Sequence, residues 1–121
     1  MIYEDEFTVA FLDINPVSHG HTLVVPKKHF MNMEEIPSDE LCHVIEAVKK
    51  VGGALKKTFD FDSYNIQVNN GATAGQVIEH LHFHVIPRHI GDGLELWPQG
   101  KYEEGIPEEL TNILRKELGQ E

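Results

Sequence analysis

Three histidines alternate with bulky apolar residues in the run 80–84, which reads His-Leu-His-Phe-His. In a β-strand, side chains at positions i, i+2 and i+4 point to the same face. A strand here would place three imidazoles on one side and leave Leu81, Phe83 and Val85 to pack on the other. Because the unperturbed pKa of histidine lies near neutrality, an imidazole can act as nucleophile, acid, base or metal ligand.

Two interpretations of these histidines do not involve covalent chemistry. The first is a structural role, although each imidazole buried in such a row needs a polar partner. The second is a metal site. Positions i and i+4 of a strand lie roughly 13 Å apart, so all three imidazoles cannot bind one ion at a bond length of about 2 Å. Further ligands would have to come from elsewhere, such as Asp13, His21 or His89.

The third interpretation is covalent catalysis at phosphorus, in which a neutral imidazole attacks a phosphoryl group and water later breaks the new P–N bond. Such a site needs a neighbour that fixes the tautomer of the nucleophile, and donors that meet the charge on the phosphoryl oxygens. A central histidine with an imidazole on each side meets the first need. Gly75 and Gln76 can offer backbone N–H groups and a side-chain amide for the second.

The elements that must position this run are mainly strands. Segments 7–14, 21–26, 64–68 and 80–86 are rich in β-branched, aromatic or alternating apolar residues and predict strands. The loop between the last two segments is too short for a crossover helix, so we predict that they pair antiparallel.

Helical periodicity is clearest over residues 38–58, where apolar residues recur on one face opposite several lysines. Ser38 is the predicted N-cap, and the consecutive glycines Gly52 and Gly53 weaken the pattern near the middle. A second helix is predicted to begin near Pro107. Together these elements predict an α+β fold, with an antiparallel sheet and helices to one side.

Composition favours a soluble protein with one domain over residues 1–121. The net charge of −10, from 20 acidic and 10 basic residues, argues against binding to nucleic acid or to an anionic membrane. Cys42 is the only cysteine, so neither an intramolecular disulfide nor a cysteine-based zinc cage can form. The first residues lack the features of a signal peptide, and no apolar run is long enough to cross a bilayer. We therefore expect a cytoplasmic protein.

Two separated stretches resemble the histidine triad (HIT) family. The run 75–86, Gly-Gln-Val-Ile-Glu-His-Leu-His-Phe-His-Val-Ile, resembles the His-x-His-x-His signature of that family. Residues 11–16 and 20–29 resemble its N-terminal region in order and spacing. The resemblance implies a HIT-like antiparallel sheet of about five strands with one long helix and a C-terminal helix. The triad strand would lie at 80–86, and a C-terminal tail and helix at 90–121.

This resemblance assigns a role to each histidine of the triad. Members of the family act on the α-phosphate of nucleotides through a transiently nucleotidylated middle histidine, with no catalytic metal. His82 would be the nucleophile, His80 would orient the neighbouring imidazoles, and His84 would donate to the phosphate or the leaving group. His21 is similar to the family's fourth histidine beside the triad.

The resemblance also implies a set of substrate contacts. Asp13 would accept from the ribose hydroxyls, and Ile14 would pack against the base. From the residues alone, a turn residue is the better interpretation of both Asp13 and His21. Val77 departs from the family pattern, because a small hydroxyl is common there and valine offers only its backbone N–H. The positions similar to phosphate or leaving-group contacts are Asn69, Gly75, Gln76 and Val77.

The activity implied is that of a hydrolase of adenosine phosphoramidates or dinucleoside polyphosphates that releases a nucleoside monophosphate. The alternatives are a nucleotidyl transferase or phosphorylase, and a non-catalytic nucleotide-binding regulatory module. No cofactor is expected, and a homodimer joined through the long helix and a strand is implied. Many prokaryotic members carry a Cys-x-x-Cys pair that helps to bind structural zinc. The pair is missing here, so we expect no metal.

Overall fold

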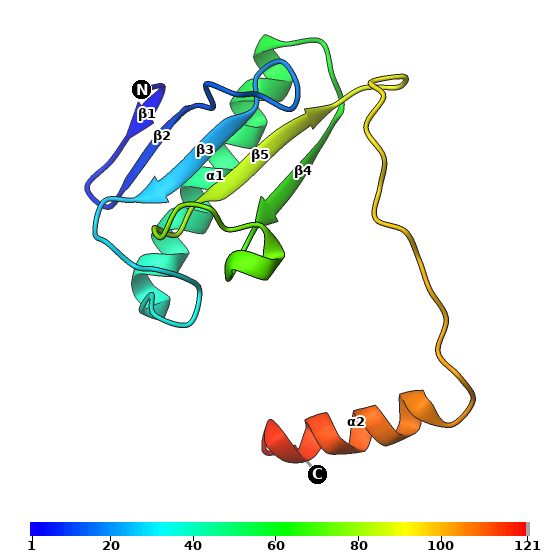
Figure 1. Cartoon of the computed structure of the whole chain (residues 1–121). Coiled ribbons are helices and arrows are strands. Elements are labelled where there is room, and N and C mark those ends of the chain that lie inside the picture. The colour runs from blue at the N-terminus through cyan, green and yellow to red at the C-terminus, as the bar shows by residue number, and fades with distance from the viewer. Residues whose placement is uncertain (121) are drawn as a thin grey trace.

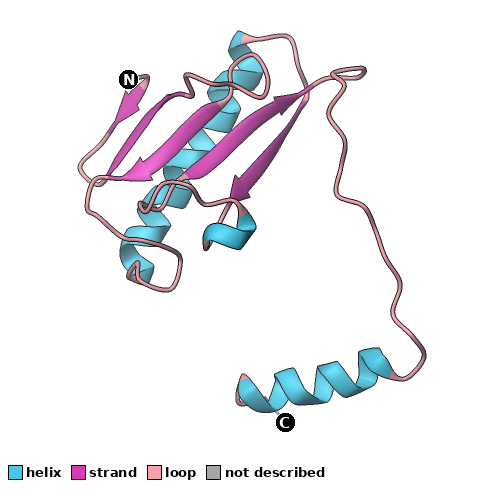
Figure 2. Cartoon of the chain, viewed as in Figure 1, coloured by secondary structure: helices cyan, strands magenta, loops and turns pink. Residues whose placement is uncertain are grey.

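Five strands form one antiparallel sheet in the spatial order β1-β2-β3-β5-β4 in the computed structural model, which describes residues 1–120. The strands are β1 (Tyr3–Glu4), β2 (Thr8–Leu12), β3 (Thr22–Pro26), β4 (Ser63–Val68) and β5 (Phe83–Arg88). The long helix α1 (Ser38–Thr58) crosses one face of this sheet (Figures 1 and 2). The predicted α+β fold is therefore confirmed, as is the antiparallel pairing of β4 with β5.

Helix α1 has the bounds that its periodicity predicts, but its N-cap is Pro37 rather than Ser38. Pro37 has the extended backbone angles of a cap residue, and its carbonyl accepts a hydrogen bond from Leu41 N–H at 2.9 Å. The prediction for Ser38 is wrong because Ser38 already belongs to the first helical turn. Asp39 and Glu40 in that turn favour the positive end of the helix dipole.

The hydrophobic core lies between α1 and the sheet. Alternation along β5 sends Phe83 and Val85 into this core, and Leu81 joins them just before the strand; all three are almost fully buried, as predicted. Because side chains alternate along a strand, His84 points to the opposite face of the sheet, away from α1. The side chains that α1 contributes to the core are Val44, Ala47, Val48, Val51 and Leu55.

Strand β5 is shifted from its predicted bounds of 80–86, since it begins at Phe83 and ends at Arg88. Pairing with β3 starts only at Phe83, opposite Val24. Just before the strand, Leu81 N–H donates instead to the carbonyl of Phe30 in a loop, at 2.7 Å. Of the three triad histidines, only His84 therefore lies inside the strand. Strand β1 was not predicted, because two residues are too short to show periodicity.

Helix α2 (Ile106–Glu117) lies apart from the sheet, at the end of an extended segment (Figure 1). It begins one residue before Pro107, in agreement with the prediction, and none of its residues is buried. Glu121, the last residue of the predicted C-terminal segment, lies outside the described residues. No helix in the part of the chain that the structure describes is both long and apolar enough to cross a membrane.

The two glycines in the middle of α1 have different surroundings. A Cβ atom built on Gly52 would lie 2.6 Å from the ring of Tyr64 in β4, whereas one built on Gly53 has nothing within 4 Å. The missing side chain at Gly52 thus lets β4 approach the helix closely. Gly52 weakens the helix locally and is nevertheless required by the packing.

We expect Gly52→Ala and Gly53→Ala to change stability in opposite directions. Alanine favours a helix over glycine by about 1 kcal/mol, so Gly53→Ala should raise the free energy of unfolding. Gly52→Ala must displace Tyr64, and overpacking of this kind costs about 1–3 kcal/mol. Urea unfolding of both variants measures the difference. A stabilised Gly52→Ala protein would show that the contact with Tyr64 imposes no constraint.

Candidate active site

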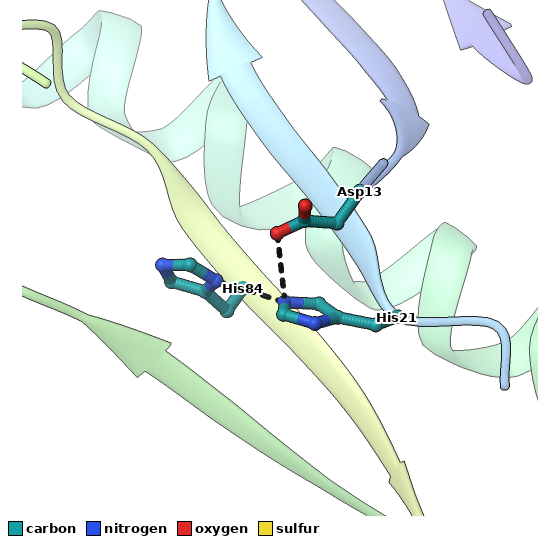
Figure 3. A group of neighbouring side chains, drawn as sticks. All are labelled: Asp13, His21 and His84. Carbon is teal, nitrogen blue, oxygen red and sulfur yellow. Dashed lines mark hydrogen bonds and ion pairs between the residues drawn. The ribbon is translucent and has the colours of Figure 1, made fainter. Parts of the chain in front are cut away.

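Asp13, His21 and His84 come together on the sheet face that α1 leaves uncovered (Figure 3). Asp13 follows β2, His21 precedes β3 and His84 lies in β5, so the three neighbouring strands deliver them to one place. Nε2 of His21 lies 2.9 Å from Nδ1 of His84 and 3.6 Å from Oδ2 of Asp13. Residues that are far apart in the sequence therefore form one hydrogen-bonded cluster.

Hydrogen bonding fixes the tautomers of both imidazoles. The backbone N–H of Val17 donates to Nδ1 of His21 at 3.0 Å. Since a neutral imidazole carries one proton, that of His21 sits on Nε2 and is donated to Nδ1 of His84. His84 then carries its own proton on Nε2. This atom is buried and has no hydrogen-bond partner among residues 1–120, so it is a donor suited to an oxyanion.

Electrostatics favours the neutral form of both side chains. Burial lowers the pKa of His21 below its ordinary value, and the Asp13 carboxylate only partly opposes this effect. Burial also lowers the pKa of His84, with further lowering from the neighbouring His82 and His21 and again an opposing effect of Asp13. Neutral imidazoles at neutral pH agree with the tautomers that the hydrogen bonds require.

The orientation of His82 is set by the backbone of His80. Nδ1 of His82 lies 2.8 Å from the carbonyl oxygen of His80. A carbonyl can only accept, so Nδ1 of His82 carries the proton and Nε2 keeps its lone pair. The rings of His82 and His84 lie 5.0 Å apart, centroid to centroid. The arrangement leaves Nε2 of His82 in the form that a nucleophile needs.

The imidazole of His80 is engaged elsewhere. Its Nε2–H donates to the carbonyl of Pro26 at 3.0 Å, so its Nδ1 accepts from Nδ1–H of His29 at 3.2 Å. These bonds join the loop before β5 to the end of β3. The carbonyl of His80 contacts His82, while its side chain holds the loop, so the orienting role of the His80 imidazole stays a prediction.

Gly75 and Gln76 need a correction, because the structure does not leave their donors unpaired as the sequence suggested. Gly75 N–H donates to Ala72 O at 3.0 Å and Gln76 N–H to Gly71 O at 3.1 Å. The buried side-chain amide of Gln76 donates to Met31 O at 2.6 Å and accepts from Gly71 N–H at 2.9 Å. Both residues therefore shape the loop around the short helix η1 (Ala72–Ala74).

Asn69 directly follows β4, and Val77 lies in the loop that leads to β5. The carboxamide of Asn69 accepts from Gln67 Nε2–H at 3.1 Å, and its Nδ2 is a long 3.5 Å from Gly75 O. Val77 is 89% exposed, and among residues 1–120 none accepts from its backbone N–H. Gly75 has a φ of +98°, a conformation that favours glycine. This backbone angle by itself accounts for a glycine at position 75, so no contact to a phosphate is needed to explain it.

The carboxylate of Asp13 contributes both to a turn and to the cluster with His21 and His84. Its Oδ1 accepts from Asn15 N–H at 2.8 Å, as the interpretation as a turn residue requires. Its Oδ2 faces His21. The next residue, Ile14, is 91% exposed. The turn thus holds both residues at the edge of the site.

A cavity of about 460 Å³ opens next to His21 and His84. Its floor comes from β4 and β5, and the segment 94–97 forms the opposite wall; neither His82 nor Asp13 lines it. Sequence reasoning missed Arg88 and Leu94 as site residues. The Gly-Asp-Gly turn at 91–93, which follows β5 directly, is the signal that could have indicated them.

The cluster could also hold a metal ion. Asp13, His21 and His84 each offer one ligand atom, and these atoms lie within 4.8 Å of one another. An ion there would have to replace the proton between Nε2 of His21 and Nδ1 of His84, which are hydrogen-bonded at 2.9 Å. His80 is turned toward Pro26 and could not contribute. Metal binding is thus an alternative to the hydrogen-bonded state.

We expect Asp13→Asn to lower the pKa values of His21 and His84 further. The substitution removes the negative charge that raises both values, and the asparagine oxygen can still accept from Asn15 N–H. Titration of the imidazole resonances by NMR measures the change. Asp39→Asn, a charge removal at the start of α1, is the control. A rise in either pKa in Asp13→Asn would contradict the assigned electrostatics.

Comparisons with known proteins identify relatives of this chain. The sequence profile of the HIT domain matches residues 1–91. The chain is 59% identical over 93 residues to an uncharacterised HIT-like protein of Methanocaldococcus jannaschii. The alignment covers 77% of this chain and 71% of that protein. It is also 35% identical over 134 residues to the adenosine 5′-monophosphoramidase of Candida albicans. That alignment covers 97% of this chain and 86% of that protein.

Among solved structures, a HIT family protein from Bacillus anthracis shares the fold. It superposes with a TM-score of 0.89 at 36% identity, and the alignment covers 98% of this chain and 84% of that chain. The matched domain includes the cluster around His21 and His84 and the whole of the triad. The chain therefore belongs to the HIT domain family.

Proposed function

We propose that this protein is a nucleotide hydrolase that attacks the α-phosphate of an adenosine phosphoramidate or a dinucleoside polyphosphate and releases a nucleoside monophosphate. One observation carries the proposal: the His80 carbonyl holds the proton of His82 on Nδ1 and so leaves the lone pair on Nε2. The monophosphoramidase named among the relatives supports the choice of substrate.

In the first step, Nε2 of His82 attacks phosphorus, a P–N bond forms and the bond to the leaving group breaks. The positive charge that develops on His82 is stabilised by the His80 carbonyl, which accepts from Nδ1–H. Nε2–H of His84 donates to a phosphoryl oxygen or gives its proton to the leaving atom, which departs with the electron pair of the broken bond. Water then attacks phosphorus, the P–N bond breaks and its electron pair returns to His82, while a proton of the water restores Nε2–H of His84 or passes to the solvent.

The proposal assigns substrate contacts on either side of the reacting phosphate. Oδ2 of Asp13 accepts from the ribose hydroxyls, and the exposed side chain of Ile14 packs against the base. Asn69 and the backbone N–H of Val77 donate to phosphate oxygens. Gly75 and Gln76 act indirectly in this scheme, because their hydrogen bonds hold the loop that carries those donors.

His82→Ala should abolish release of AMP from an adenosine phosphoramidate and from a diadenosine polyphosphate, by about a thousandfold or more. His89→Ala is the matched control, because the ring of His89 packs edge-on against Phe61 and makes no hydrogen bond with residues 1–120. Mass spectrometry of the quenched wild-type reaction should detect the nucleotidylated protein, and His82→Ala should show none.

Addition of a chelator to the same assay distinguishes covalent catalysis from a metal-dependent reaction. Turnover that survives chelation supports covalent catalysis at His82, whereas turnover that chelation removes supports a metal-dependent reaction at Asp13, His21 and His84. Nucleotide binding without any turnover in the wild-type protein would identify a regulatory module. Transfer of the nucleotidyl group to added phosphate in place of water would identify a phosphorylase.

We also propose that the protein is a homodimer whose partner subunit covers α2. An amphipathic helix of 12 residues is marginal in water by itself and needs an apolar surface. Leu110, Ile113 and Leu114 are all exposed, and α2 stands away from its own sheet (Figure 1). A second copy of the chain offers exposed apolar side chains in return, including Ile45 on α1.

Leu114→Glu should convert the dimer to a monomer, because it places a charge in the apolar face of α2. Asn112→Glu adds the same charge about 160° away around the helix and should leave the dimer intact. Size-exclusion chromatography with light scattering gives the mass of each variant. A dimer that persists in Leu114→Glu would exclude α2 from the interface.

A further inference from the structure

The loop 14–20, which connects β2 to β3, is tied to β5 by the hydroxyl of Ser18. Ser18 Oγ–H donates to the carbonyl of Pro87, near the end of β5, at 2.7 Å. Within residues 1–120, every other hydrogen bond of this loop stays inside it or reaches the residues that flank it. One serine side chain therefore joins the loop to the strand that carries His84.

This bond lies just beyond the point where β3 and β5 stop pairing. The last paired residues are Thr22 and Val85. Gly20, two residues before Thr22, has a φ of +92° and so leaves the strand conformation. The loop nevertheless stays against β5, since a Cβ atom built on Gly20 would lie 3.4 Å from Cγ of Pro87. The hydroxyl of Ser18 thus continues the contact with β5 after the backbone ladder has ended.

The peptide group next to Ser18 carries the donor that contacts His21. Val17 N–H donates to Nδ1 of His21 at 3.0 Å, and Ser18 O accepts from the backbone N–H of His21 at 3.1 Å. The Val17 side chain is half exposed, so packing contributes little to the position of this amide. The bond from Ser18 to Pro87 is the contact that holds the amide relative to β5.

The hydrogen bond between His21 and His84 can be protonated in two ways. With the Val17 amide at Nδ1 of His21, the proton lies on Nε2 of His21 and His84 keeps its own on Nε2. In the reverse arrangement, Nδ1–H of His84 donates to His21, and Nε2 of His84 is bare and can only accept. Asp13 favours the first arrangement, but its Oδ2 lies 3.6 Å from Nε2 of His21, beyond hydrogen-bond distance. The Val17 amide is therefore the close contact that selects between the two.

We propose that Ser18 is a positioning residue that keeps the proton of His84 on Nε2 by holding the Val17 amide against His21. The inference rests on the proposed function, in which this Nε2–H donates to the phosphoryl oxygen or the leaving atom. The hydroxyl of Ser18 is bonded to Pro87, three residues after His84 on the same strand. It therefore fixes the donor to His21 and the strand of His84 relative to each other.

NMR of the full chain without substrate tests the protonation pattern directly. The nitrogen-15 shifts of an imidazole distinguish a protonated ring nitrogen from a bare one. We expect protons on Nε2 of both His21 and His84 in the wild type. Ser18→Ala removes the bond to Pro87, so the population of His84 protonated on Nδ1 should rise. Ser18→Thr keeps a hydroxyl and should restore the pattern of the wild type.

Steady-state kinetics with an adenosine phosphoramidate measures the effect on the reaction. We expect kcat to fall about fivefold in Ser18→Ala, as the loss of one hydrogen bond implies, and to recover in Ser18→Thr. KM should change little, because the proton of His84 acts at the reacting phosphate. Ser63→Ala is the matched control, since it removes a serine hydroxyl that donates to Oδ1 of Asp62 at 2.9 Å at the start of β4. It should leave both the imidazole shifts and kcat unchanged.

The two measurements distinguish failure of the role of Ser18 from failure of the proposed function. Unchanged imidazole shifts in Ser18→Ala, or equal changes in Ser63→Ala, would overturn the role of Ser18 even in an active enzyme. Altered shifts with an unchanged kcat would overturn its role in the reaction. Absence of turnover by the wild type would overturn the proposed function, and the shifts would still decide whether Ser18 sets the protonation of His84. Altered shifts with a lower kcat, both restored by Ser18→Thr, support the inference.

Discussion

One hydrogen bond from a backbone amide determines the protonation pattern of the site. Val17 N–H donates to His21, and this bond obliges His21 to donate to His84 and leaves His84 with an N–H that has no acceptor in the described part of the chain. The next residue anchors the turn that carries this amide, because Ser18 Oγ donates to Pro87 O at 2.7 Å. A turn thus controls which nitrogen of a distant imidazole carries a proton. The chemistry proposed for the triad depends on that choice.

The histidines that look equivalent in the sequence have three different environments. His80 secures a loop through Pro26 and His29, His82 is oriented by a carbonyl, and His84 belongs to a relay with His21. This division follows from where β5 begins. A strand that started at His80 would have placed three similar imidazoles side by side, whereas the start at Phe83 lets the first two turn toward loop partners.

Much of this arrangement could be predicted from local patterns. The alternation around Phe83 and Val85 indicated which face His84 takes, and helical periodicity located α1, although its N-cap lies one residue earlier than predicted. The side-chain bonds of Gln76 and Arg88 could not be predicted in this way. Each joins segments that are remote in sequence or meet only after folding, such as Met31 with Gln76 and Asn65 with Arg88. No periodicity records such pairings, because they depend on where loops end in space.

The close approach of Gly52 to Tyr64 has a consequence for the cavity on the far side of the sheet. Tyr64 rests on α1, and its neighbour Asn65 faces the other way, into the cavity and toward Arg88. The depth of the strand relative to the helix therefore sets the position of the cavity floor. A glycine behind the sheet thus influences the shape of a cavity that it does not line.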